Sequence, residues 1–173
     1  MEKKQNWAHR VLLACLLIYL LVMTWVILFK MAMPGDWGAL AGQRSLHLLP
    51  FQGWDSQNAA LVRKDLLNNI LVFVPLGILL SALWHRRPAW QRALAGMGVS
   101  LCYETLQFVF AIGRSDSTDV LANTLGAVAG IALCQVFWLV LKDEARVKKA
   151  VALCSAAVGL LLVGLVALLL AAN

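Results

Sequence analysis

The sequence predicts an all-α integral membrane protein with five transmembrane helices, its N-terminus cytoplasmic and its C-terminus external. Of its 173 residues, 61% are hydrophobic and 14% are charged, whereas ordinary soluble domains contain about 45–50% and about 25%. A water-soluble fold of this length could not bury so much apolar surface. The composition therefore excludes a soluble enzyme, a disordered chain and a disulfide-stapled secreted module.

Five apolar stretches approach or exceed the roughly 20 residues that cross a bilayer core. They run over residues 11–29, 66–84, 93–111, 118–141 and 151–172. The second is the least regular, because it contains Asn68, Asn69, Pro75 and Gly77. No repeat, low-complexity tract or linker divides the chain, so residues 1–173 are expected to form a single membrane domain.

The positions of lysine and arginine predict the orientation of the spans. Ten of the 15 basic residues fall in three short segments, at positions 3–10, 86–92 and 142–149. The alternate segments, a loop at about 30–65 and a turn at 112–117, hold the rest, offset by aspartates. The three basic segments are therefore expected on the cytoplasmic side. The net charge of +6 then reflects topology, and no nucleic-acid partner is expected.

The four cysteines each lie in a different apolar stretch: Cys15, Cys102, Cys134 and Cys154. No C-x-x-C pair is present, so neither a zinc site nor a redox motif is indicated. We expect them to be small apolar side chains, with no metal and no cofactor.

Polar groups inside the predicted spans are the informative residues, because a charge near the bilayer centre costs about 2.5–3.5 kcal/mol on insertion scales. The third span carries Glu104 and Gln107, which lie three residues apart and so share one helix face. Glu104 is either a protonated or paired structural glutamate or a functional carboxylate that faces a cavity. It is the one candidate for a catalytic residue.

The fourth span begins with polar residues and continues with glycines. Asp116 and its serine neighbours are good N-cap residues, and Asp119 complements the helix dipole. At 100° per residue, five positions share an arc of about 80°: Asp116, Asp119, Asn123, Gly126 and Gly130. The two glycines predict the close approach of a neighbouring helix. The polar half is expected to face that neighbour or a cleft above it.

Pro75 interrupts the second span, where it removes a backbone donor and frees the carbonyl of Leu71. Gly77 gives room for a bend or for close packing, and Asn69 lies nearer the external end. The segment is either a simple kink or a kink beside a pocket.

Seven polar residues from three predicted helices and one turn collect in the outer half of the membrane or on its external face. They are Asn69, Glu104, Gln107, Arg114, Asp116, Asp119 and Asn123. A random scatter would place some of them near the cytoplasmic ends. The pattern predicts an outward-facing polar pocket.

At these residues the sequence resembles the VanZ-like family of teicoplanin-resistance-associated membrane proteins. Asn69, Phe73, Pro75 and Gly77 follow the family spacing N-x-x-x-F-x-P-x-G, and the Leu49-Pro50-Phe51 segment is similar too. The pair Glu104 and Gln107 and the run from Arg114 to Gly130 complete the resemblance, which covers about residues 23–141. It implies a multi-pass protein of the bacterial cytoplasmic membrane and carries no settled mechanism. The fifth span lies outside it.

Four functions stay open. The first is a non-enzymatic protein that binds or shields an envelope lipid, a lipid-linked precursor or a glycopeptide antibiotic such as teicoplanin. The second is a membrane enzyme for a lipid-linked substrate, with Glu104 as general acid or base, although no familiar catalytic motif is present. The third is a proton-coupled lipid transporter. The fourth is an accessory subunit or homo-oligomer assembled through the glycine face. We favour binding over catalysis.

Overall fold

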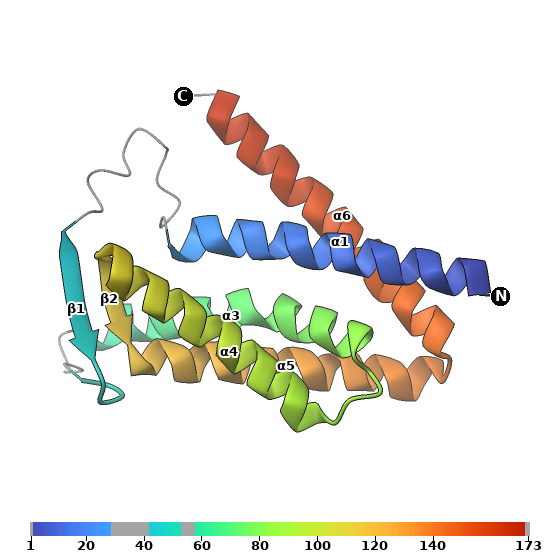
Figure 1. The fold of residues 1–173 in the computed structure, drawn as a ribbon, viewed down its shortest axis with the longest axis horizontal. Helices are drawn as coiled ribbons and strands as arrows, with labels where there is room; N and C mark the ends of the chain where they lie inside the picture. The colour runs from blue at the N-terminus through green and yellow to red at the C-terminus, as the bar shows by residue number, and fades with distance from the viewer. Residues whose placement is uncertain (1, 29–41, 53–57, 172–173) are drawn as a thin grey trace.

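The computed structural model describes residues 2–28, 42–52 and 58–171, which contain five helices and two short strands (Figure 1). In chain order these are α1 (Glu2–Ile27), β1 (Gln43–His47), α3 (Ala59–Leu83), α4 (Ala89–Phe110), β2 (Ile112–Asp116), α5 (Ser117–Leu141) and α6 (Glu144–Ala171). Parts of the predicted loop at 30–65 fall outside the described residues. The protein is thus helical, with a small sheet that the sequence did not predict.

Within this described part, four stretches are long and apolar enough to cross a membrane. They are Trp7–Ile27, Ala59–Leu83, Ala89–Phe110 and Ser117–Leu141. They correspond to the first four predicted spans. The fifth, at 151–172, coincides with α6 in the backbone, but residue 172 and most side chains beyond 160 lie outside the described set. The number of five spans therefore stays a prediction.

Helices α3 and α5 pack through glycines. A Cβ at Gly126 would overlap the main-chain carbonyl of Ile70, and one at Gly130 would overlap that of Val74. From the other side, a Cβ at Gly77 would overlap the carbonyl of Ala127. Small residues let helix backbones approach this closely in membranes. The glycine face of α5 is therefore covered by α3 and is not free for a partner.

Helix α1 packs on α3 and α6 and contacts α3 close to its proline. Its Tyr19 hydroxyl donates a hydrogen bond to the carbonyl of Val72, three residues before Pro75. A neighbouring helix can thus satisfy main-chain acceptors near a proline, as membrane interiors require. Tyr103 of α4 donates in turn to the Leu20 carbonyl at 3.0 Å, which ties α1 to α4.

The two strands form a parallel pair in which Gln43 lies opposite Ile112 and His47 lies opposite Asp116. The sequence predicted a turn at 112–117, but residues 112–116 form a paired strand. Its partner precedes two intervening helices in the sequence, so no local pattern announces the pairing. The strands lie at one end of the helical bundle (Figure 1).

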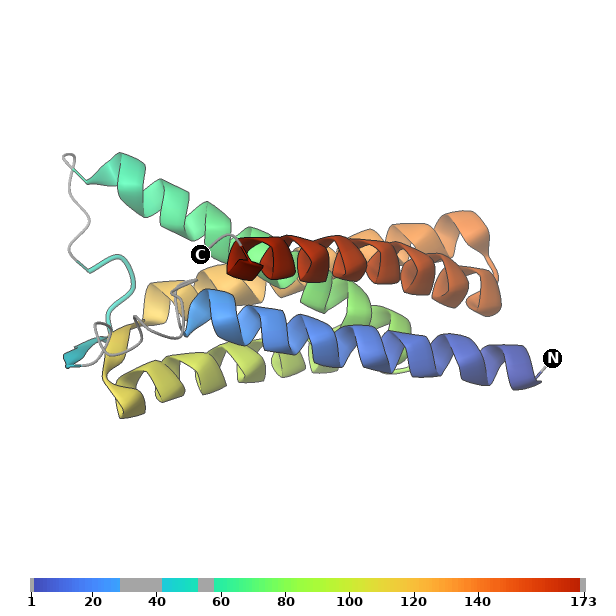
Figure 2. The ribbon, with the colours of Figure 1, turned by 90° about the horizontal axis from the view of Figure 1, so that it is seen from above.

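The turns of the chain gather at the two ends of the bundle (Figures 1 and 2). We call the end with β1, β2 and the start of α5 the acidic end. The opposite end holds the start of α1, the turn between α3 and α4, and the turn between α5 and α6, and we call it the basic end. The three lysine- and arginine-rich segments thus share one end, as the alternation of predicted spans requires.

Candidate functional site at the acidic end

Glu104 lies inside the bundle near the acidic end, with only 6% of its surface exposed. Helix α4 stops six residues later at Phe110, and Ala111 adopts a left-handed conformation with φ 53° that reverses the chain into β2. This reversal brings the main-chain N–H of Asp116 back to Glu104, where it donates to Oε2 at 2.8 Å. The glutamate thus fixes the connection between α4 and α5.

Asp116 is the N-cap of α5, as the sequence indicates, and its Oδ1 accepts from the Thr118 N–H at 2.8 Å. Its other oxygen, Oδ2, lies 3.4 Å from Arg114 Nε and 3.8 Å from His47 Nδ1. Asp116 is 4% exposed, whereas the Arg114 side chain is 54% exposed. A buried carboxylate is therefore flanked by one accessible cation and one imidazole.

Asp119 joins this group from the first turn of α5. Its Oδ1 accepts a hydrogen bond from Asn69 Nδ2 of α3 at 2.7 Å. The carboxyl groups of Glu104, Asp116 and Asp119 lie close enough to interact electrostatically. Like charges repel most strongly in a low-dielectric interior, so the cluster favours a bound cation, a hydrogen-bond donor or a shared proton.

Gln107 and Asn123 are buried and each has one unsatisfied acceptor. Gln107 Nε2 donates to the carbonyl of Ile27 in α1 at 3.0 Å, and Asn123 Nδ2 donates to Ser100 Oγ in α4 at 2.8 Å. Within the described part of the chain, no partner is found for Gln107 Oε1 or Asn123 Oδ1. Buried acceptors of this kind are rare and call for water or a ligand.

The seven predicted residues therefore fall into four groups rather than one cluster. Glu104, Arg114 and Asp116 are joined through Asp116, and Asn69 is joined to Asp119. Gln107 and Glu104 share a helix face but have different partners, since Gln107 donates to α1 and Glu104 accepts from β2. Asn123 lies deeper, against α4.

His47, Thr118 and Ser100 are partners that the sequence did not single out. His47 reaches Asp116 only because β1 pairs with β2 in that register. Thr118 Oγ1 accepts from the N–H of Phe51 at 2.8 Å, and Ser117 Oγ donates to the carbonyl of Leu48 at 2.9 Å. The Leu49-Pro50-Phe51 segment was the one sequence feature that pointed to these contacts, because it lies where the loop packs on the start of α5.

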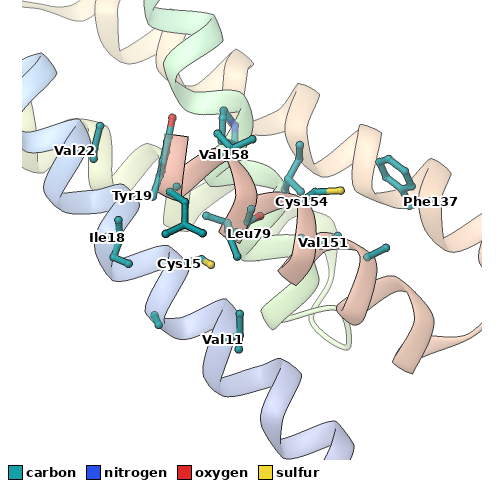
Figure 3. Close-up of a pocket in the computed structure, with 18 residues that line it drawn as sticks. Val11, Cys15, Ile18, Tyr19, Val22, Leu79, Phe137, Val151, Cys154 and Val158 are labelled. Carbon is teal, nitrogen blue, oxygen red and sulfur yellow. The ribbon is translucent and has the colours of Figure 1, made fainter. Parts of the chain in front are cut away.

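An apolar cavity lies elsewhere, between α1 and α6 and against α3 (Figure 3). It has a volume of about 670 Å³ and an almost wholly apolar lining that includes Ile18, Tyr19, Pro75 and Val158. A second cavity of about 370 Å³ lies at the basic end. None of the seven residues lines either of them. Among the described residues, no group of three or more histidine, cysteine or acidic side chains is arranged to hold a metal ion.

Helices that can cross a membrane at least four times, joined at one end by a buried polar network, define a multi-pass membrane protein. The chain belongs to the VanZ/LLP1 family, which matches residues 16–141. It is similar to Protein VanZ of Enterococcus faecium, with 32% identity over 122 residues that cover 68% of this chain and 70% of that protein. No solved structure matches it. The match includes all seven residues and leaves out α6.

Proposed function

We propose that this protein binds an amphiphilic component of the cell envelope at its acidic end, without chemical turnover. The ligand class is an envelope lipid, a lipid-linked precursor or a lipid-bearing glycopeptide of the teicoplanin type. The observation that carries the proposal is the convergence of Glu104, Asp116 and Asp119 at one end of a membrane bundle. Carboxylates accept hydrogen bonds and attract cations, so the recognised group is rich in donors, such as amine or sugar hydroxyl groups.

Two further features support a ligand over a purely structural role. The orphaned acceptors of Gln107 and Asn123 belong to the same end. The exposed Arg114 leaves a cation at the surface above the buried carboxylates, where an anionic part of the ligand could pair with it. Similarity to Protein VanZ of Enterococcus faecium supports the antibiotic branch of the proposal.

A membrane enzyme with Glu104 as general acid or base is the second candidate, and a proton-coupled lipid transporter is the third. The geometry favours them less, because Glu104 Oε2 already accepts the main-chain N–H of Asp116. An acid–base role would have to use the other oxygen. Binding and turnover are therefore the two outcomes that the experiment must separate.

The test compares teicoplanin and vancomycin susceptibility in a strain that lacks the gene. It uses the wild type, Glu104→Gln and Asp119→Asn at matched membrane levels. Asp143→Asn is the matched control, because it makes the same carboxyl-to-amide change at an exposed residue of the basic end. We expect wild type and control to raise teicoplanin tolerance alone and both acidic-end variants to lose the effect.

If the wild type does not change teicoplanin susceptibility, the glycopeptide is excluded as the ligand and the envelope lipids remain as candidates. Purified protein is then incubated with extracted envelope lipids. Saturable, stoichiometric retention without product supports the proposal, whereas a lipid that is consumed supports the enzyme.

We also propose five spans in the bacterial cytoplasmic membrane, with the N-terminus cytoplasmic and the C-terminus external. The clustering of basic segments at one end supports this orientation. Reporters fused after residues 87 and 143 should report a cytoplasmic position. A reporter fused after residue 173 should report an external position. A cytoplasmic C-terminus would reduce the number of spans to four.

A further inference from the structure

The second of the two cavities, whose lining is partly polar, lies at the basic end, away from the site described above. It has a volume of about 370 Å³. Its polar lining comes from α1, from the turn between α3 and α4, and from the first turns of α6: His9, His85, Arg86, Arg87, Glu144 and Lys148. Three separate segments of the chain thus bring their basic residues to one hollow.

The charges in this cavity are unbalanced. Arg86, Arg87 and Lys148 carry positive charge, and Glu144 is the one acidic residue in the lining. Glu144 Oε1 lies 2.6 Å from Lys148 Nζ, and its Oε2 lies 3.8 Å from Arg86 Nη2. Within the described residues, the Arg87 guanidinium makes no ion pair. Two positive charges therefore stay unneutralised even before the two histidines are counted.

Part of the lining, at His85, is held in place by contacts with its neighbours. The His85 ring stacks on the Trp138 ring of α5, with centroids 4.0 Å apart and an angle of 15° between the planes. His85 Nε2 lies 3.6 Å from Glu144 Oε2. The α6 N-terminus is already capped by Asp143, whose Oδ1 accepts from the Ala145 N–H at 2.8 Å. Recognition of an anion here would therefore come from side chains.

The position of the cavity indicates which kind of anion it would bind. It lies where the membrane-capable helices α3 and α5 end, and Trp84 on its rim is 48% exposed. Exposed tryptophans are typical of the membrane–water interface, where lipid phosphate groups lie. Basic pockets between membrane helices bind anionic headgroups, and an anionic leaflet strengthens such binding.

We propose that the cavity at the basic end binds the phosphate group of an anionic lipid headgroup. The site is independent of the acidic end and of the function proposed there. Free phosphate has the same chemistry, so the experiment must separate the two sources.

The test uses the full-length protein in detergent and native mass spectrometry, with dioleoyl phosphatidylglycerol as the probe and phosphatidylcholine as the neutral comparison. The Arg87→Gln/Lys148→Gln variant should bind phosphatidylglycerol about tenfold more weakly than the wild type. The matched control is Arg146→Gln/Lys149→Gln, which removes the same charge from side chains of α6 outside the cavity. It should change binding less than about twofold.

Equal losses in the two double variants would overturn the proposal, because they would show general surface attraction. Equal retention of the two lipids by the wild type would overturn it as well. Excess inorganic phosphate is added as a competitor. Displacement of phosphatidylglycerol would show that phosphate alone suffices, and its persistence would assign the site to the lipid. The single variant Arg87→Gln is included in case the double variant misfolds. Its guanidinium makes no ion pair within the described residues, so its removal should leave the fold intact.

Discussion

The two ends of the bundle handle charge in opposite ways. At the acidic end, Glu104 and Asp116 are buried, Glu104 accepts from the main chain of β2, and His47 of β1 lies 3.8 Å from Asp116. At the basic end, the Arg86 side chain is 84% exposed, and Glu144 takes its shortest contact from Lys148, four residues along the same helix. The first end is a buried network, and the second combines exposed guanidinium groups with one partly buried ion pair.

This difference separates stability from exchangeable binding. Buried polar groups must keep their partners, because an unsatisfied one costs about 1–3 kcal/mol. Exposed ion pairs contribute about 0–1 kcal/mol and can change partner at little cost. We therefore expect changes at the acidic end to affect both folding and function strongly, and changes at the basic end to affect binding more than stability.

The largest expected effect comes from the glycine contact that supports both ends. Gly130→Ala places a Cβ against the main chain of Val74 and Ile78, which should destabilise the protein by about 3 kcal/mol or more. Gly98→Ala on α4 meets nothing within 4 Å and should be neutral or stabilising by up to about 1 kcal/mol. Thermal unfolding in detergent measures both. Similar melting temperatures for the two variants would refute the packing argument.

The comparison is sharpened by truncating one glutamate at each end. Glu104→Ala leaves the buried N–H of Asp116 without its acceptor and should destabilise by about 1–3 kcal/mol. Glu104→Gln keeps an acceptor oxygen and should be milder. Glu144→Ala at the basic end should cost less than about 1 kcal/mol. Denaturant unfolding of the three variants would contradict this order if Glu144→Ala were the most harmful.

A smaller effect is expected from the amide deep in the acidic end. Asn123 Nδ2 donates to Ser100 Oγ at 2.8 Å between two buried side chains. Interhelical hydrogen bonds in membranes average about 0.6 kcal/mol in double-mutant cycles. A cycle with Asn123→Ala and Ser100→Ala should give a coupling energy of that size. A coupling of zero would mean that the contact does not contribute to stability.

The smallest effect concerns pH at the basic end. The hydrogen bond from Lys148, aided by His85 and Arg86, holds the pKa of Glu144 below its ordinary value of 4.5. A lowered folded-state pKa stabilises the protein above pH 4.5, and this contribution is lost as the pH falls through the lowered value. At pH 7 the free energy of unfolding of the wild type should exceed that of Glu144→Gln by about 0.3–0.5 kcal/mol, as measured by denaturant unfolding. A difference that grows on acidification would show that the sign is wrong.

Hydropathy and capping rules predicted the helices well, because each signal is local. Four predicted spans coincide with helices, and Asp116 is the N-cap of α5. The starts of helices were harder, since α3 begins at Ala59 rather than near residue 66. A helix that extends beyond the membrane carries polar residues that hydropathy counts as loop.

The candidate site could be predicted only as a set of residues. The helical period places Glu104 and Gln107 on one face, but it cannot say that one turns to Asp116 and the other to Ile27. His47 was missed because its contact depends on the pairing of β1 with β2. Such long-range registers leave no periodic trace in a single sequence.

The strand pair also constrains how the protein is made. β1 is synthesised before α3 and α4, and β2 is synthesised after them, so the two strands can meet only once both intervening helices are in place. Glu104 depends on a main-chain N–H that lies 12 residues later in the chain and is presented by β2. Until β2 arrives, this carboxyl has to be kept hydrated or protonated by its surroundings. A chain truncated after α4 would therefore carry a glutamate without this partner within its last helix.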